Sequence, residues 1–87
     1  MQVTVPQINM NGDTKESLLA EAKKAYLKLD DARCAVAAIT VHGRNFQTMQ
    51  DGSMRLQQAL EERRELLQKL QECQTYAIEL YNGIARQ

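Results

Sequence analysis

The sequence predicts an all-α fold: an antiparallel helical hairpin of two long helices with a short N-terminal arm, assembling into a homo-oligomeric helical bundle. Three observations predict it. Apolar residues recur in alternating steps of four and three along both halves of the chain. A polar stretch containing glycine separates the halves. The 87 residues include no Trp and one Phe, so a single hairpin buries little core, and self-association is the expected remedy.

The first twelve residues are polar, with isolated β-branched residues, and are either an extended arm or a short ordered lead-in. Asn11-Gly12 is a turn signal. Asp13 follows as the expected cap of the first helix, and Glu16, three residues later, completes the pattern of a capping box. We therefore expect an arm over residues 1–12 and a hairpin over residues 13–87.

The first helix is expected over about residues 14–41. Its apolar residues form an unbroken heptad seam, the pattern with which one helix packs along another. The seam consists of Leu18, Ala22, Ala25, Leu29, Ala32, Val36 and Ile39. Leu19 and Tyr26 lie beside it and widen the apolar stripe.

The second helix is expected over about residues 53–83, after a bend of about residues 42–52, with Asn82-Gly83 as its stop. Its apolar residues form two neighbouring rows. The first row is Leu56, Leu60, Leu67, Leu70, Ala77 and Ile84, and the second is Leu66, Cys73 and Leu80. Two rows are broader than one partner helix needs, so a second contact surface is expected, most simply another copy of the chain.

The bend holds the only His and the only Phe of the chain and is the candidate ligand site. Arg44 is a bidentate donor for phosphate, Asn45 can read the edge of a base, and the ring of Phe46 can stack on one. Gly43 allows close approach of the backbone, and His42 can donate or accept. A structural role explains the same residues: Phe46 closes the end of the hairpin, His42 caps the first helix and Arg44 is solvated.

Arg63 interrupts the second seam, between Leu60 and Leu67. A guanidinium on an apolar stripe must reach solvent or find an anionic partner. It either extends to solvent, pairs with a Glu of another subunit, or faces a ligand phosphate at a subunit junction.

Several classes of function are disfavoured. No nucleophile constellation or nucleotide-binding loop occurs, so we expect no enzyme and no cofactor. One His and no CxxC argue against a metal site. Balanced charge, 11 basic against 11 acidic residues, argues against long nucleic acid, and no apolar run is long enough to span a membrane. Cys34 and Cys73 are expected to be reduced and buried, as in a cytosolic protein.

Two short motifs carry a resemblance to a known family. Asn11-Gly12-Asp13-Thr14 before a helix, followed by His42-Gly43-Arg44-Asn45-Phe46, resembles a group of small phage-encoded helical-hairpin proteins whose bend reads His-Gly/Ala-Arg-Asp-Tyr-Tyr. The group is similar to the phage anti-CBASS and anti-Thoeris sponges, which are oligomeric, often hexameric, and sequester cyclic nucleotide second messengers without cleaving them. This chain departs from the pattern at Asn45, at Phe46-Gln47 and at Glu62-Arg63, where a Glu-His pair is usual.

The resemblance implies a phage immune-evasion protein in the host cell cytoplasm that binds a cyclic di- or trinucleotide. The implied contacts are Arg44, Asn45 and Phe46, with His42 and Gly43 shaping the bend and Asn11 and Gly12 in the N-terminal motif. The alternative is a structural protein, a phage helical adaptor or assembly factor that binds another protein through the second helix. A small nucleic-acid-binding hairpin is a third possibility, which the neutral charge opposes.

Overall fold

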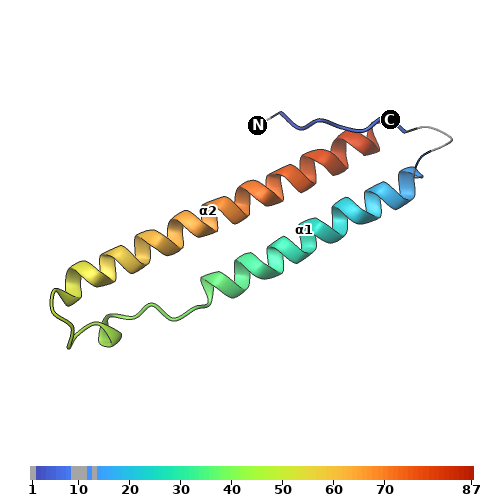
Figure 1. Ribbon diagram of the computed structural model, residues 1–87. Helices are drawn as coiled ribbons and strands as arrows, with labels where there is room; N and C mark the ends of the chain where they lie inside the picture. The colour runs from blue at the N-terminus through green and yellow to red at the C-terminus, as the bar shows by residue number, and fades with distance from the viewer. Residues whose placement is uncertain (1, 9–11, 13) are drawn as a thin grey trace.

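A computed structural model describes residues 2–8, 12 and 14–87. It confirms the helical hairpin: within these residues the elements are the helix α1 (Lys15–Ala37), the short 3-10 helix η1 (Gly43–Asn45) and the helix α2 (Gly52–Ala85), with no strand. The two long helices lie side by side and antiparallel, joined by the bend at one end (Figure 1). The result is a rod of 63 × 21 × 17 Å.

The first helix begins with a side-chain cap. Thr14 is the N-cap, and its hydroxyl oxygen accepts a hydrogen bond from the backbone N–H of Ser17 at 3.1 Å. A hydroxyl in this position satisfies one of the four backbone donors that an α-helix leaves free at its start. Asp13, the residue expected to cap the helix, lies outside the described residues.

The helix α1 ends at Ala37, before the predicted end near residue 41. Three β-branched residues in succession, Ile39, Thr40 and Val41, follow this point. Such residues lose rotamer freedom in a helix and favour extended backbone. The chain therefore leaves the helix earlier than the apolar period alone indicates.

The helix α2 runs through Gly83 to Ala85 rather than ending at the Asn82-Gly83 pair. Gly83 has no positive φ, so it does not serve as a helix stop. The absence of its side chain serves a contact instead, because a Cβ there would collide with the side chain of Val5 in the N-terminal arm. The glycine lets the arm lie directly against the helix.

The described part of the arm, residues 2–8, runs along the C-terminal end of α2 (Figure 1). Gln87 holds it with both ends of its amide: Nε2 donates to the carbonyl oxygen of Pro6 at 2.7 Å, and Oε1 accepts from the backbone N–H of Ile8 at 3.0 Å. Lys15 Nζ donates to the carbonyl oxygen of Gln87 at 2.7 Å. The arm, the start of α1 and the end of α2 are thus joined.

The seam of α2 lies where the sequence predicts it, because every member of its first row is at least half-buried. The contact face of α1 is turned relative to the prediction. Two of the predicted members, Ala25 and Ile39, are exposed, whereas Tyr26 and Arg33 are half-buried. The buried or half-buried residues of α1 are Lys15, Leu18, Leu19, Ala22, Tyr26, Leu29, Asp30, Ala32, Arg33 and Val36. The turn leaves Ala25 of the predicted seam exposed.

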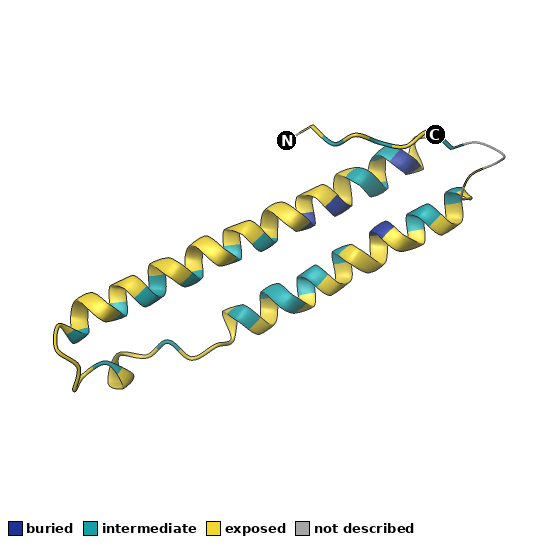
Figure 2. Ribbon diagram, in the orientation of Figure 1, coloured by how far each residue is buried: buried dark blue, intermediate teal, exposed yellow. Residues whose placement is uncertain are grey.

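Few residues are fully enclosed. The buried ones among the described residues are Ala22, Gln74, Ala77 and Ile84, and all lie in the half of the hairpin nearest the arm (Figure 2). Toward the bend the facing residues are only half-buried. The arm therefore closes the better packed end of the rod.

Candidate functional site

The bend begins with a local cap. His42 has extended backbone, and its Nδ1 accepts a hydrogen bond from the backbone N–H of Arg44 at 3.1 Å. This bond holds the imidazole against the start of η1. Arg44 and Asn45 are exposed, and the guanidinium of Arg44 makes no hydrogen bond or ion pair with any described residue. Its donors are available to a ligand.

Phe46 lies at the end of η1 and is half-buried. Its carbonyl oxygen accepts from the backbone N–H of Met49 at 3.2 Å, which tightens the turn. The same oxygen approaches Gly52 so closely that a Cβ on Gly52 would overlap it. Asp51, just before, has a φ of 56°, in the left-handed region that Asp tolerates better than most residues. The Asp-Gly pair thus allows the chain to enter α2 abruptly.

Arg63 has a partner within the hairpin. Its NH1 donates to the carbonyl oxygen of Ile39 at 2.6 Å and, at the longer distance of 3.4 Å, to that of Ala37. Carbonyl groups at the end of a helix lack intrahelical partners, and a cation there also faces the negative end of the helix dipole. The guanidinium on the apolar seam therefore caps α1, a role that the sequence interpretation did not include.

Two further arginines line a hollow beside Arg63. The hollow has a volume of about 570 Å³ and is bounded by both helices near the bend. Each guanidinium has an acidic neighbour one turn away: Arg33 pairs with Asp30 at 2.9 Å, and Arg64 pairs with Glu61 at 2.8 Å. The lining comprises Arg33, Ala37, Leu60, Arg63, Arg64, Leu67, Gln68 and Gln71.

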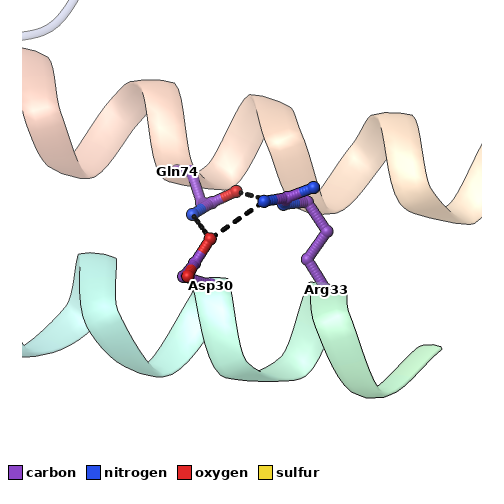
Figure 3. A network of polar contacts seen from close by, with 3 residues as sticks. All are labelled: Asp30, Arg33 and Gln74. Atoms are coloured by element: carbon purple, nitrogen blue, oxygen red, sulfur yellow. Dashed lines mark hydrogen bonds and ion pairs between the residues drawn. The ribbon is translucent and has the colours of Figure 1, made fainter. Parts of the chain in front are cut away.

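A polar triad crosses the helix pair at its centre (Figure 3). Arg33 Nε donates to Gln74 Oε1 at 3.0 Å, Gln74 Nε2 donates to Asp30 Oδ1 at 3.2 Å, and Arg33 NH2 donates to the same Asp30 oxygen at 2.9 Å. Gln74 is only 7% exposed, so these bonds satisfy an amide that would be costly to bury alone. Hydrogen bonds from Arg33 and Gln74 hold the pKa of Asp30 below its ordinary value, and the bond to Asp30 raises the pKa of Arg33.

Two features of the sequence indicate this triad, although the sequence analysis did not predict it. Continuing the four-three steps of the second seam from Leu70 reaches Gln74 before Ala77. A single polar residue at a seam position commonly fixes helix register. Asp30 and Arg33 are one turn apart on α1, which is the spacing of a local ion pair.

One side of the hairpin carries one apolar row from each helix, and the residues of these rows are exposed or only half-buried. Leu18 and Ala25 of α1 line a common groove with Cys73 and Leu80 of α2. Seven-residue spacing keeps residues on nearly the same side of two helices packed along each other, so the rows continue toward the bend. We call this surface the open face, and its members are Leu18, Ala25, Ala32, Ala59, Leu66, Cys73 and Leu80. Leu66 is 54% exposed.

The groove in the open face has a volume of about 840 Å³ and lies in the half nearest the arm. Its other lining residues are Thr4, Pro6, Glu21, Ala22, Leu29, Lys69, Glu72, Tyr76, Ala77 and Ile84. Apolar and small side chains predominate, and the charged residues Glu21, Lys69 and Glu72 are few. Such a surface suits an apolar side of another polypeptide more than a polar small molecule.

The remaining predictions concern the N-terminal motif and the two cysteines. Gly12 is exposed, and Asn11 lies outside the described residues. Cys34 and Cys73 are free thiols, but the prediction that they are buried is wrong, because both are exposed. Cys73 belongs to the row of α2 that α1 does not reach, and this explains its exposure.

Among residues 2–8, 12 and 14–87, His, Cys, Asp and Glu side chains form no cluster of three or more that could hold a metal ion. Neither α1 nor α2, the long helices of that same part of the chain, is apolar over a length sufficient to cross a bilayer. Comparison with known family models, with curated proteins and with solved structures found no match to this chain.

Proposed function

We propose that the protein is a non-catalytic helical adaptor or assembly factor that joins protein subunits through its open face. The observation that carries the proposal is the open face itself, where both helices line a wide, mostly apolar groove and where Ala25, Leu66 and Cys73 are exposed to solvent. Monomeric soluble proteins rarely expose a continuous apolar surface of this kind, and where they do it usually marks an interface.

The shape of the molecule supports the same proposal. The radius of gyration is 19.0 Å, whereas a compact domain of this length has one of about 12 Å. A slender rod offers its partners long surfaces and encloses little volume for chemistry. Leu66 on the open face and Ile39, just after the end of α1, are exposed apolar residues toward the bend, of a size that a partner helix can cover.

The experiment uses the substitution Leu66→Glu. Tagged wild-type protein and the variant are incubated in extract from the native host, cross-linked and captured, and bound proteins are identified by mass spectrometry. We expect at least one partner that the wild type retains and the variant loses, because a carboxylate at the centre of an apolar interface is desolvated without compensation.

The matched control is Gln58→Glu, an exposed position on the same helix outside the open face. It adds the same charge and should retain every partner. Recovery of identical proteins with all three chains, or of none with the wild type, would contradict the adaptor proposal.

A second candidate is the capture of a cyclic di- or trinucleotide, without cleavage, by an oligomer such as the hexamer that the resemblance of the bend to phage sponges implies. Two observations favour it. The exposed guanidinium of Arg44 lies two residues along the chain from the half-buried Phe46, and Arg33 and Arg64 line the hollow beside Arg63. Guanidinium groups bind phosphate oxygens, and aromatic rings stack on bases.

Isothermal titration calorimetry with a panel of cyclic di- and trinucleotides, at micromolar protein, tests this candidate. Binding by the wild type and its loss in the Arg44→Ala/Phe46→Ala variant, with oligomer mass unchanged, is the expected result. An absence of heat for every compound in the panel would remove the candidate and leave the adaptor proposal intact.

A further inference from the structure

We infer that the groove near the arm binds a second copy of this chain, packed antiparallel on the same groove, so that two hairpins close a four-helix bundle. The inference rests on the proposed function and names one of its partners. It assigns the arm half of the open face to self-association and leaves the bend half, around Leu66, to a different protein.

The exposed area of the hairpin supports a partner of this size. The chain exposes 6912 Å², whereas a compact monomer of 9.9 kDa exposes about 5,200 Å². The excess is about 1,700 Å², and each partner in a stable interface of standard size contributes about 800 Å². One hairpin therefore carries enough surplus surface for a second copy on the groove and for another contact elsewhere.

The groove has the composition of a helix-packing surface. Ala25 is exposed in its middle, and the buried residues Ala22 and Ala77 form its floor, so small side chains at these positions let another helix approach closely. Tyr76, at 45% exposure, and Leu80 stand beside them as larger apolar groups. Alternating small and large residues on two copies of one surface can interdigitate, as they do in four-helix bundles.

The charges at the groove are arranged for an antiparallel copy. Glu21 lies on α1 toward the arm, and Lys69 lies on α2 toward the bend, because the helices run in opposite directions. A two-fold axis across the middle of the groove brings Glu21 of one copy to the level of Lys69 of the other. A parallel arrangement would instead bring like charges to the same level. Glu72, one turn from Lys69, reaches the level of Glu21 as well, so the antiparallel pairing sets one like pair beside the unlike one. The parallel pairing sets only like charges at the same level, so the charges favour the antiparallel pairing.

The arm of the same chain covers only one end of the groove. Thr4 and Pro6 line that end, next to Ile84, which is 1% exposed. The middle of the groove, from Ala25 to Cys73, has no covering segment among the described residues. A second chain therefore has room to pack while the arm stays in place.

Sedimentation-velocity measurements on the purified chain, from about 1 to 100 µM, test the inference. We expect a concentration-dependent species of twice the chain mass of 9.9 kDa. The Ala25→Glu variant should remain monomeric at 100 µM, because it adds a charge to the middle of the groove. Ala20→Glu, the same substitution at an exposed position of α1 away from the groove, should dimerise as the wild type does. Circular dichroism confirms that each variant is helical.

The two cysteines supply a second measurement that requires no substitution. Both thiols are exposed in one hairpin, but only Cys73 lines the groove. The rate at which a thiol reagent labels Cys73 should therefore fall several-fold between 1 and 100 µM protein, whereas the rate for Cys34 should not change.

The results separate this inference from the proposed function. Any of three results would overturn the inference that a second copy binds the groove. These are a wild-type monomer at every concentration, a labelling rate of Cys73 that does not fall with protein concentration, and a dimer that persists in the Ala25→Glu variant. If cellular partners are still lost with Leu66→Glu in that case, the adaptor proposal stands alone. A dimer with the expected properties but without any cellular partner would retain the inference and reject the adaptor.

Discussion

Replacement of Arg63 by Met tests whether the guanidinium caps α1 or is free to bind a ligand. Met keeps the unbranched apolar stem and removes the bond to Ile39, which is 2.6 Å long. A hydrogen bond from a charged group stabilises by about 1.5–3 kcal/mol, and the interaction with the helix end adds about 0.3–1 kcal/mol. Arg63 is only half-buried, so the lower ends of these ranges apply.

An opposing effect reduces this loss. A thioether on the apolar seam packs better than a guanidinium and raises the free energy of unfolding by about 0.5–1 kcal/mol. The net destabilisation expected for Arg63→Met is therefore about 0.8–1.3 kcal/mol, because the lost charged bond outweighs the improved packing. In a chain of this length such a loss lowers the Tm by about 3–10 °C.

Thermal unfolding followed by circular dichroism, at one fixed protein concentration, measures the effect. The matched control is Arg64→Met at the neighbouring residue. Arg64 pairs with Glu61 on the surface, where the side chains are 73% and 57% exposed, and such pairs contribute about 0–1 kcal/mol. If Arg63→Met is as stable as Arg64→Met, the cap contributes nothing and the reasoning about Arg63 is refuted.

Three further predictions concern the ends and the centre of the rod. Gly52→Ala should destabilise by about 1–3 kcal/mol in urea unfolding, because the new Cβ overlaps the Phe46 carbonyl oxygen and backbone must move; an unchanged midpoint would refute that contact. Gly83→Ala should displace Val5 and speed proteolysis of the arm without loss of helicity, and adding Val5→Ala to this variant should slow the proteolysis again. A cleavage rate unchanged by Gly83→Ala would contradict the packing of Val5 on Gly83. Stability contributed by Asp30, whose pKa is lowered in the folded chain, is present above the ordinary Asp pKa of about 3.9 and is lost as the pH falls through the folded value. Asp30→Asn should therefore flatten the acid limb of the stability curve below about pH 4, and an unchanged slope would exclude the triad as its cause.

The hairpin was predictable because the heptad period is a direct record of which side of each helix is apolar. The rotation of α1 was not, because the period defines a broad apolar stripe without deciding which of its rows faces the partner. Here polar residues decide it: Arg33 turns inward to bond with Gln74, and Ala25 turns outward as a result. A rule that assigns only apolar residues to the interface cannot anticipate that choice.

At the candidate site the residue types were predictable and their partners were not. The sequence marks Arg63 as a cation in an apolar row, but its acceptors are backbone carbonyls of another helix, and these have no sequence signature. Likewise, Gly83 has the appearance of a helix stop, and only the three-dimensional course of the arm gives it a different role. The exposed Arg44 and Asn45 agree with the ligand interpretation and with a solvated turn alike, so binding at the bend stays a prediction.

The triad of Asp30, Arg33 and Gln74 has a consequence for tolerance of insertions. A heptad repeat by itself allows two helices to slide by seven residues, since each shifted alignment again brings apolar rows together. Such a slide would leave the amide of Gln74 buried without hydrogen-bond partners. The triad therefore stabilises one helix register over the others. Residues added between Gln47 and Gln50 should therefore extend outward from the bend and leave the register of α1 and α2 unchanged. The bend is for this reason a suitable place to insert a reporter peptide.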